Sequence, residues 1–221
     1  MDEHAWYAAV IVARTLLGSG LRVASAHHGN LPLEATMHRT ALRIFLPAAA
    51  VVTVAACASA PAPLNRIAVA YATISNVAGE RRGTAELWQD LDKVVHVDVQ
   101  LTGLPPGPHG IHFHEKGLCE PDGATAFASA GSHFNPIGRQ HGLDNPAGPH
   151  GGDAPNFTVN ASGNGRASFT TDRVSLTDGS TSVFDADGSA IVIHAAADDQ
   201  TSQPSGNSGA RIACGVVKRA P

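Results

Sequence analysis

Residues 94–101 read VVHVDVQL, and this stretch decides the class of fold. Apolar residues, among them Val95, Val97 and Val99, alternate with polar ones along it. Successive side chains of a β-strand point to opposite faces, so the alternation predicts a strand with one face in a core and the other in water. A strand of this kind is typical of an antiparallel sheet.

Further short segments carry β-strand signals on either side of this stretch. Residues 163–165, GNG, predict a hairpin turn, and two aperiodic stretches, about 115–156 and 195–210, predict long loops, which in a compact domain are usually functional or cross-linked. We therefore expect a small antiparallel sandwich or barrel with two elaborate loops. The other predicted strands are residues 67–74, 84–91, 157–159, 166–170, 189–194 and 216–218.

The composition fits this expectation and limits the partners. The chain has 221 residues, which suit one domain plus an extension, and it is rich in Gly (23) and Pro (14), as loop-rich β proteins are. The formal net charge of −4 argues against nucleic acids and anionic membrane surfaces as partners.

The N-terminal part resembles an export signal. Residues 37–56 combine a basic start with an apolar run at 44–56 that is too short to span a bilayer, and they end in VAAC at Cys57, like a bacterial lipobox. We expect a signal peptide with lipidation of Cys57 as a membrane anchor, in the periplasm or cell envelope. An ordinary signal peptide cleaved after Ala56 or near Ala60 is the alternative. Ala58 follows Cys57 in place of aspartate, which favours sorting of the lipoprotein to the outer membrane, if the cell has one.

The remaining boundaries follow from this signal. We expect translation to begin at Met37, so that residues 1–36 are a mis-annotated or non-essential extension, with a genuine extension as the alternative. Residues 57–66 predict a linker of small residues and prolines, and residues 67–221 predict the functional domain.

Histidines gather in residues 109–119, HGIHFHEKGLC. His112 and His114 stand two apart on a strand-like stretch, so their side chains share a face and can reach one ion. Taken alone, two solvent-facing histidines are the other interpretation. Partners for them follow later in the chain, because the first long loop carries His133, His141, His150 and Asp153, and His194 ends a predicted strand. Imidazoles suit copper and zinc, and a carboxylate is an acceptable zinc ligand. His96 stands apart and is interpreted as a surface residue.

Five motifs in this order resemble the copper–zinc superoxide dismutases: GIHFHEKGLC, SAGSHFNP, QHG…PHGGD, AIVIHAAADD and GNSGARIACGVV. The resemblance spans roughly residues 67–217. It implies an all-β fold, a Greek-key β-sandwich or flattened eight-stranded antiparallel barrel with two long functional loops. It also implies Cu and Zn as cofactors and superoxide anion as the substrate, dismuted to dioxygen and hydrogen peroxide.

The resemblance assigns roles to individual residues. His133 would bridge both metals as an imidazolate, stabilised by two dications. Asp198 would orient a copper histidine and a zinc histidine, with a surface acid as the alternative, and His109 would be a structural neighbour of the site. The implied ligands are His112, His114, His133 and His194 for copper, and His133, His141, His150 and Asp153 for zinc.

The resemblance also implies a disulfide between Cys119 and Cys214, against the alternative of two free thiols. That bond would hold Arg211 close to the copper, where the arginine would guide and dock the anion.

One segment departs from the family pattern. Residues 198–207 lack the Lys and Glu residues of many eukaryotic members, and Ser205 stands where threonine is usual. Lys116 is a possible substitute for these residues in guiding the superoxide anion, although a surface lysine without that role is the stronger interpretation. A non-catalytic dismutase-like metal-binding or chaperone domain is the competing function. The sequence leaves homodimer and monomer both open.

Overall fold

Strand β3 (Val95–Leu101) runs through the barrel wall between β2 (Arg81–Gln89) and β7 (Gly165–Thr171) in a computed structural model of the chain. This model describes residues 65–123 and 125–221. Val95, Val97, Val99 and Leu101 are at most 2% exposed, while the residues between them are partly or fully exposed. The alternation in the sequence therefore marks the inner and outer faces of the wall.

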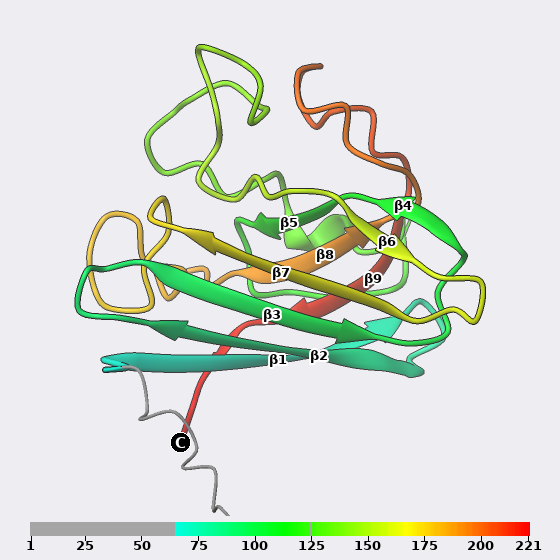
Figure 1. Cartoon of the computed structure of the whole chain (residues 1–221), viewed down its shortest axis with the longest axis horizontal. Coiled ribbons are helices and arrows are strands. Elements are labelled where there is room, and N and C mark those ends of the chain that lie inside the picture. Colours follow the sequence, from blue (N-terminus) through cyan, green and yellow to red (C-terminus); the bar gives the residue numbers. More distant parts are fainter. Residues whose placement is uncertain (1–64, 124) are drawn as a thin grey trace, which may run out of the picture. The chain divides into compact units, whose positions relative to one another are not determined.

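The described residues form one antiparallel sheet. In that sheet the strands follow the order β4-β6-β7-β3-β2-β1-β9-β8-β5, and β10 pairs with β1 (Figure 1). The other elements are β1 (Ala68–Asn76), β4 (Gly107–His109), β5 (Ile111–His114), β6 (Phe157–Val159), β8 (Ala190–His194), β9 (Arg211–Val216), β10 (Lys218–Arg219) and the 3-10 turn η1 (Ala128–Ala130).

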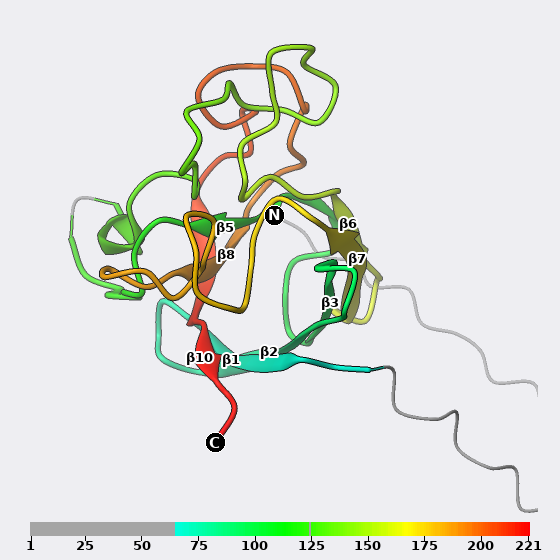
Figure 2. The same ribbon diagram turned by 90° about the vertical axis from the view of Figure 1, so that its left-hand side faces the viewer.

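The sheet curls into a nearly closed barrel, as the end view in Figure 2 shows. The two strands at the ends of the sheet order, β4 and β5, are separated in the chain by Gly110 alone. One bent segment therefore pairs with β6 on one side and β8 on the other. Counting this segment as one strand, and setting aside the two-residue β10, leaves the eight strands expected. The all-β fold is confirmed.

The two long loops lie where the sequence predicts them. The first connects β5 to β6 over residues 115–156, and the second connects β8 to β9 over residues 195–210. Both loops rise from the same side of the barrel and lie close together in Figures 1 and 2. A third connection, residues 172–189, was not singled out by the sequence, and it adds Val174, Leu176 and Val183 to the core.

Two strands differ from the expectation. β9 begins at Arg211, five residues before the predicted closing strand, because the small residues Ala213, Cys214 and Gly215 give a weak strand signal. β4 was not predicted, because glycine and proline are depleted in strands.

The N-terminal predictions, namely the extension, the signal peptide, lipidated Cys57 and most of the linker, lie outside the described residues. Within residues 65–123 and 125–221, no helix has the length and apolar character needed to cross a membrane.

Candidate metal centre

Strand β5 supplies the base of the site. Ile111 and Phe113 point into the barrel core, so His112 and His114 point to the opposite face, where the long loops cover them. Both histidines are 1% exposed. The two-residue period of a strand thus delivers two imidazoles to one buried place.

The first long loop lies antiparallel against β5. The N–H of Phe113 donates to the carbonyl of Gly152, and the N–H of Phe134 donates to the carbonyl of Phe113. These bonds bring His133 opposite His114 and Asp153 opposite His112. Gly152 is required here, because a Cβ at this position would overlap the Phe113 carbonyl.

Four histidines converge as one group. His112, His114, His133 and His194 each offer a ring nitrogen, and these nitrogens lie within 4.8 Å of one another. The nitrogens are His112 Nδ1 and the Nε2 atoms of the other three, and each is buried without a hydrogen-bond partner in the part of the chain that the structure describes. Buried polar atoms rarely stay unpaired, so four converging lone pairs fit a metal ion. An all-imidazole set suits copper.

The opposite ring nitrogens fix the orientation of these rings. His114 Nδ1 donates to the carbonyl of Gly131 over 3.0 Å, and His194 Nδ1 donates to the carbonyl of Gly209 over 3.3 Å. A carbonyl accepts only from N–H, so the lone pair of each ring is left on Nε2, the atom that faces the group.

The second group is built around one carboxylate oxygen. Asp153 Oδ1 lies 2.9 Å from Nδ1 of His133, 2.9 Å from Nδ1 of His141 and 3.4 Å from Nδ1 of His150. Ligands about 2.0 Å from a tetrahedral zinc ion are roughly 3.3 Å apart, so these separations fit zinc between the four atoms. Asp153 Oδ2 accepts from the N–H groups of Gly142 and His150, which hold the carboxylate in place.

His133 belongs to both groups and presents a different nitrogen to each. Its Nε2 faces the all-histidine group, and its Nδ1 faces Asp153. The ring is buried from both sides, with 5% of the residue exposed.

Asp198 also joins the two groups. Its Oδ2 lies 2.7 Å from His112 Nε2, and its Oδ1 lies 3.0 Å from His141 Nε2. Burial tends to raise the pKa of this carboxyl, but the hydrogen bonds from His112 and His141 outweigh burial and hold the pKa well below its usual range. The side-chain amide of Asn156 donates to the carbonyl of Asp198 and accepts from the backbone N–H of Asp198, and these two bonds fix the Asp198 backbone.

Burial also sets the protonation of the ligands. It lowers the pKa of His133 to about 4 and that of His194 to about 3, and it lowers the pKa of His114 well below the usual value. Burial acts in the same direction on His141, but hydrogen bonds to Asp153 and Asp198 raise the pKa of that residue to about 9. The rings of His114, His133 and His194 are therefore neutral at physiological pH, as metal-binding imidazoles must be.

A small cavity of about 170 Å³ opens onto the all-histidine group. Its lining includes His114, His133, His194 and Arg211, together with Pro204 and Ser205 of the second long loop. The guanidinium of Arg211 donates to the carbonyls of Phe127 (2.7 Å) and Gly131 (2.6 Å). Burial lowers the pKa of Arg211, but an arginine keeps its charge in proteins. The cavity therefore holds one fixed positive charge beside the histidine nitrogens.

Cys119 and Cys214 form a disulfide, which confirms the predicted pair. It ties the start of the first long loop to β9, three residues beyond Arg211. Residues 127–131, whose carbonyls accept from Arg211, follow Cys119 in the first long loop, so the disulfide tethers the part of the loop that holds this arginine.

Three further residues from the sequence analysis lie outside both groups. His109 is buried, and its ring nitrogens meet the carbonyls of His194 and Pro105. His96 stacks on Trp88 and bonds to Asp90 on the outside of the barrel. Lys116 lines a separate hollow beside Asp185 and Asp187 and is not among the residues of the cavity at Arg211.

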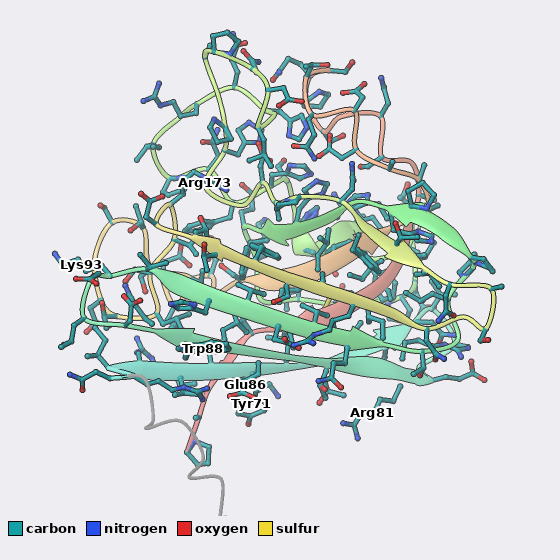
Figure 3. The ribbon with its side chains drawn as sticks, viewed as in Figure 1. Tyr71, Arg81, Glu86, Trp88, Lys93 and Arg173 are labelled. Carbon is teal, nitrogen blue, oxygen red and sulfur yellow. A yellow bond between two sulfur atoms is a disulfide. The ribbon has the colours of Figure 1, made fainter. Side chains whose placement is uncertain are left out.

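Sequence reasoning missed several supports of the site. Arg173 donates to the carbonyl of Asp153 over 2.7 Å from the third connection, and Figure 3 shows it near the base of the first long loop. Asn156 and the carbonyls of Phe127 and Gly131 were also missed. No spacing rule identifies them, because their roles depend on the paths of the loops.

Comparison with known proteins agrees with this geometry. The family model described as copper/zinc superoxide dismutase matches residues 81–217, which is more than half of the chain. The chain belongs to the copper/zinc superoxide dismutase family. Copper and zinc are accordingly the cofactors that its two histidine groups fit.

Curated relatives and solved structures cover about two thirds or more of this chain. "Superoxide dismutase [Cu-Zn] 2" of Aquifex aeolicus is 44% identical over 67% of this chain and 86% of its own. "Superoxide dismutase-like protein YojM" of Bacillus subtilis is 38% identical over 82% of this chain and 96% of its own. The crystal structure of a SOD-like protein from Bacillus subtilis superposes with a TM-score of 0.61 at 40% identity, over 66% of this chain and 96% of that one.

The fit between Asp198 and its surroundings yields a test. Gly206 has φ +65°, and an added Cβ would overlap the Asp198 carboxylate and lie 2.7 Å from His141 Nε2. We expect Gly206→Ala to displace Asp198 and to weaken copper and zinc binding by about 10–100-fold. Competition with a chelator of known affinity measures both constants.

Gly138→Ala is the matched control, because Gly138 has φ +66° and open space around the added Cβ. It carries the same backbone strain without touching Asp198. Equal metal affinities in the two variants would show that contact with Asp198 has no part in metal binding.

Proposed function

We propose that this chain dismutes superoxide in the reaction 2 O₂⁻ + 2 H⁺ → O₂ + H₂O₂. Membership of the family supports the general activity. The observation that carries the proposal for this chain is the cavity, which is lined by the guanidinium of Arg211 and by His114, His133 and His194, three members of the all-histidine group.

The proposed ligands are the two groups described above. Bound copper would supply one-electron chemistry, in which Cu(II) could accept an electron from one superoxide and Cu(I) could return it to another. His112, His114, His133 and His194 would hold copper, and His133, His141, His150 and Asp153 would hold zinc.

Arg211 attracts and docks the anion. The chain is acidic overall, so attraction of superoxide depends on a local positive charge. Two carbonyls hold the guanidinium in place, so docking the anion requires little reorganisation of the side chain. Local fields of this kind raise association rates by about 10–10³-fold, and salt weakens them.

His133 supplies a proton to the reaction. Its Nε2 faces the cavity, and in this proposal that atom would carry the proton that the peroxide product needs. Its Nδ1 lies 2.9 Å from Asp153 Oδ1, so the zinc-binding residues would keep the ring in place while Nε2 carries that proton. Asp198 holds the rings of His112 and His141 on either side.

We also propose a place for the protein in the cell envelope. The signal-like residues 37–56 and the lipobox-like end at Cys57 support export and lipid anchoring. In this arrangement residues 57–66 link the anchor to the catalytic domain at 67–221, and residues 1–36 are a mis-annotated or non-essential extension. The homodimer and the monomer are both compatible with this proposal.

A non-catalytic metal-binding role is the second candidate, because one relative at 38% identity bears the name "superoxide dismutase-like". The two functions separate in one experiment on the protein made in an oxidising compartment. Dismutation requires about one copper and one zinc per chain together with fast removal of superoxide. Bound metal without dismutation would reject the enzymatic proposal and support the second candidate.

The role of Arg211 is tested by Arg211→Ile. We expect kcat/KM for superoxide to fall at least several-fold, with copper and zinc contents retained, because Arg211 does not ligate either metal. The rate should also depend less on ionic strength, since the local charge is gone. Pulse radiolysis at several salt concentrations measures both effects.

Arg81→Ile controls for the lost charge. Arg81 is exposed and lies on the opposite side of the barrel from the two long loops (Figure 3). Its replacement should leave kcat/KM within about twofold of the parent. An unchanged low-salt rate in Arg211→Ile would contradict the docking role.

A further inference from the structure

The second long loop, residues 195–210, contains no lysine or arginine, yet it forms one wall of the copper cavity through Pro204 and Ser205. Two glutamines of this loop reach across to the first long loop. We propose that Gln200 and Gln203 are positioning residues that fasten this wall to the zinc-binding segment, so that zinc occupancy sets the shape of the copper cavity. The inference rests on the proposed ligand sets.

Gln203 makes two hydrogen bonds to the backbone of His141. Its Oε1 accepts from the backbone N–H of His141 over 2.9 Å, and its Nε2 donates to the carbonyl of His141 over 2.9 Å. Nε2 also donates to the carbonyl of Thr201 over 3.1 Å, which fixes the orientation of the amide. A primary amide is the side-chain group that donates and accepts side by side in this way, so the fit is specific to its chemistry.

Gln200 makes a second attachment to the first long loop, at residues beyond His141. Its Oε1 accepts from the N–H of Leu143, and its Nε2 donates to the carbonyl of Ala154, both over 3.2 Å. Its backbone carbonyl accepts from the N–H of Asp144. Leu143 and Ala154 lie on either side of His150 and Asp153 in the chain, so Gln200 contacts both ends of the stretch that carries these two zinc ligands.

The two attachments connect the zinc group to the cavity wall by a short path. His141 is a proposed zinc ligand, Gln203 holds its backbone, and Pro204 and Ser205 follow Gln203 in the chain. A zinc ion that fixes His141 therefore also fixes these two residues of the wall beside Arg211. In this chain the loop contributes the shape of the cavity, and the charge comes from Arg211.

Asp198 is the alternative connection between the loops, since it contacts His141 Nε2. The two connections differ in what they hold. Asp198 fixes the imidazole of His141, whereas Gln203 fixes its backbone and stands next to the wall residues. Removing Gln203 leaves every ligand and Asp198 in the chain. Gln203 is also exposed, so its replacement leaves the buried core unaltered.

The first measurement is the rate of zinc transfer from the copper- and zinc-loaded protein to a chromogenic chelator. Gln203→Ala removes two hydrogen bonds to His141, and we expect zinc to be released roughly tenfold faster. Gln203→Glu should act in the same direction, because its carboxylate faces the His141 carbonyl. Gln140→Ala is the control, since Gln140 is exposed beside His141 and its side chain contacts Asn145 of the same loop.

The second measurement is amide hydrogen exchange over residues 201–207, with and without zinc. In the parent and in Gln140→Ala, zinc should slow exchange in this segment. In Gln203→Ala with zinc bound, exchange should stay near the zinc-free rate. Unfolding temperature and disulfide content identify any variant that fails to fold. The double variant of Gln200→Ala with Gln203→Ala should release zinc faster than Gln203→Ala does.

Zinc-dependent protection and zinc release that are the same in Gln203→Ala and the parent would overturn the proposal. Neither measurement uses superoxide, so the positioning role can fail while dismutation holds, and dismutation can fail while the positioning role holds.

Discussion

Five buried imidazole nitrogens that lack a hydrogen-bond partner among the described residues constrain the rest of this structure: His112 Nδ1, His150 Nδ1, and the Nε2 atoms of His114, His133 and His194. Leaving such atoms unpaired in a low-dielectric interior costs about 1–3 kcal/mol each. Their lone pairs, together with Asp153, converge in two groups of possible metal ligands. Metal ions bound there would pair these atoms and remove the energetic penalty. The arrangement of β5 and both long loops can be understood as the scaffold that keeps these nitrogens together.

The barrel makes that scaffold rigid. β5 lies at the end of the sheet order, paired with β8, so its other edge is free to pair with a loop without disturbing the core. The first long loop pairs with this edge through backbone hydrogen bonds at Phe113, and the disulfide fixes the beginning of the loop to β9. The carbonyl of Gly131 then accepts from both His114 and Arg211, which places ligand and anion-binding charge in one frame.

The sequence predicted the strands and the histidines unequally well. β3 and the pair on β5 follow from the two-residue period of a strand, which depends on local geometry alone. The list of site residues in the long loops came from their chemistry and from the resemblance to a family. Which nitrogen of His133 faces which group was beyond the sequence, because it depends on the bonds between the loop and β5.

The supports of the site were the least predictable part. Gln200, Gln203 and Asn156 act through backbone groups that are distant in sequence, so no spacing reveals them. The early start of β9 was missed because Ala213, Cys214 and Gly215 have weak strand preferences. Arg211 was predicted beside the copper, but the carbonyls that hold it emerge only from the folded loop.

The sharing of His133 between the two groups is the central claim, and electron paramagnetic resonance tests it most directly. With Cu(II) in both groups, a bridging imidazole couples the two unpaired spins, and we predict that most of the signal disappears at low temperature. Two additive, uncoupled Cu(II) signals that account for all the copper would contradict a shared His133.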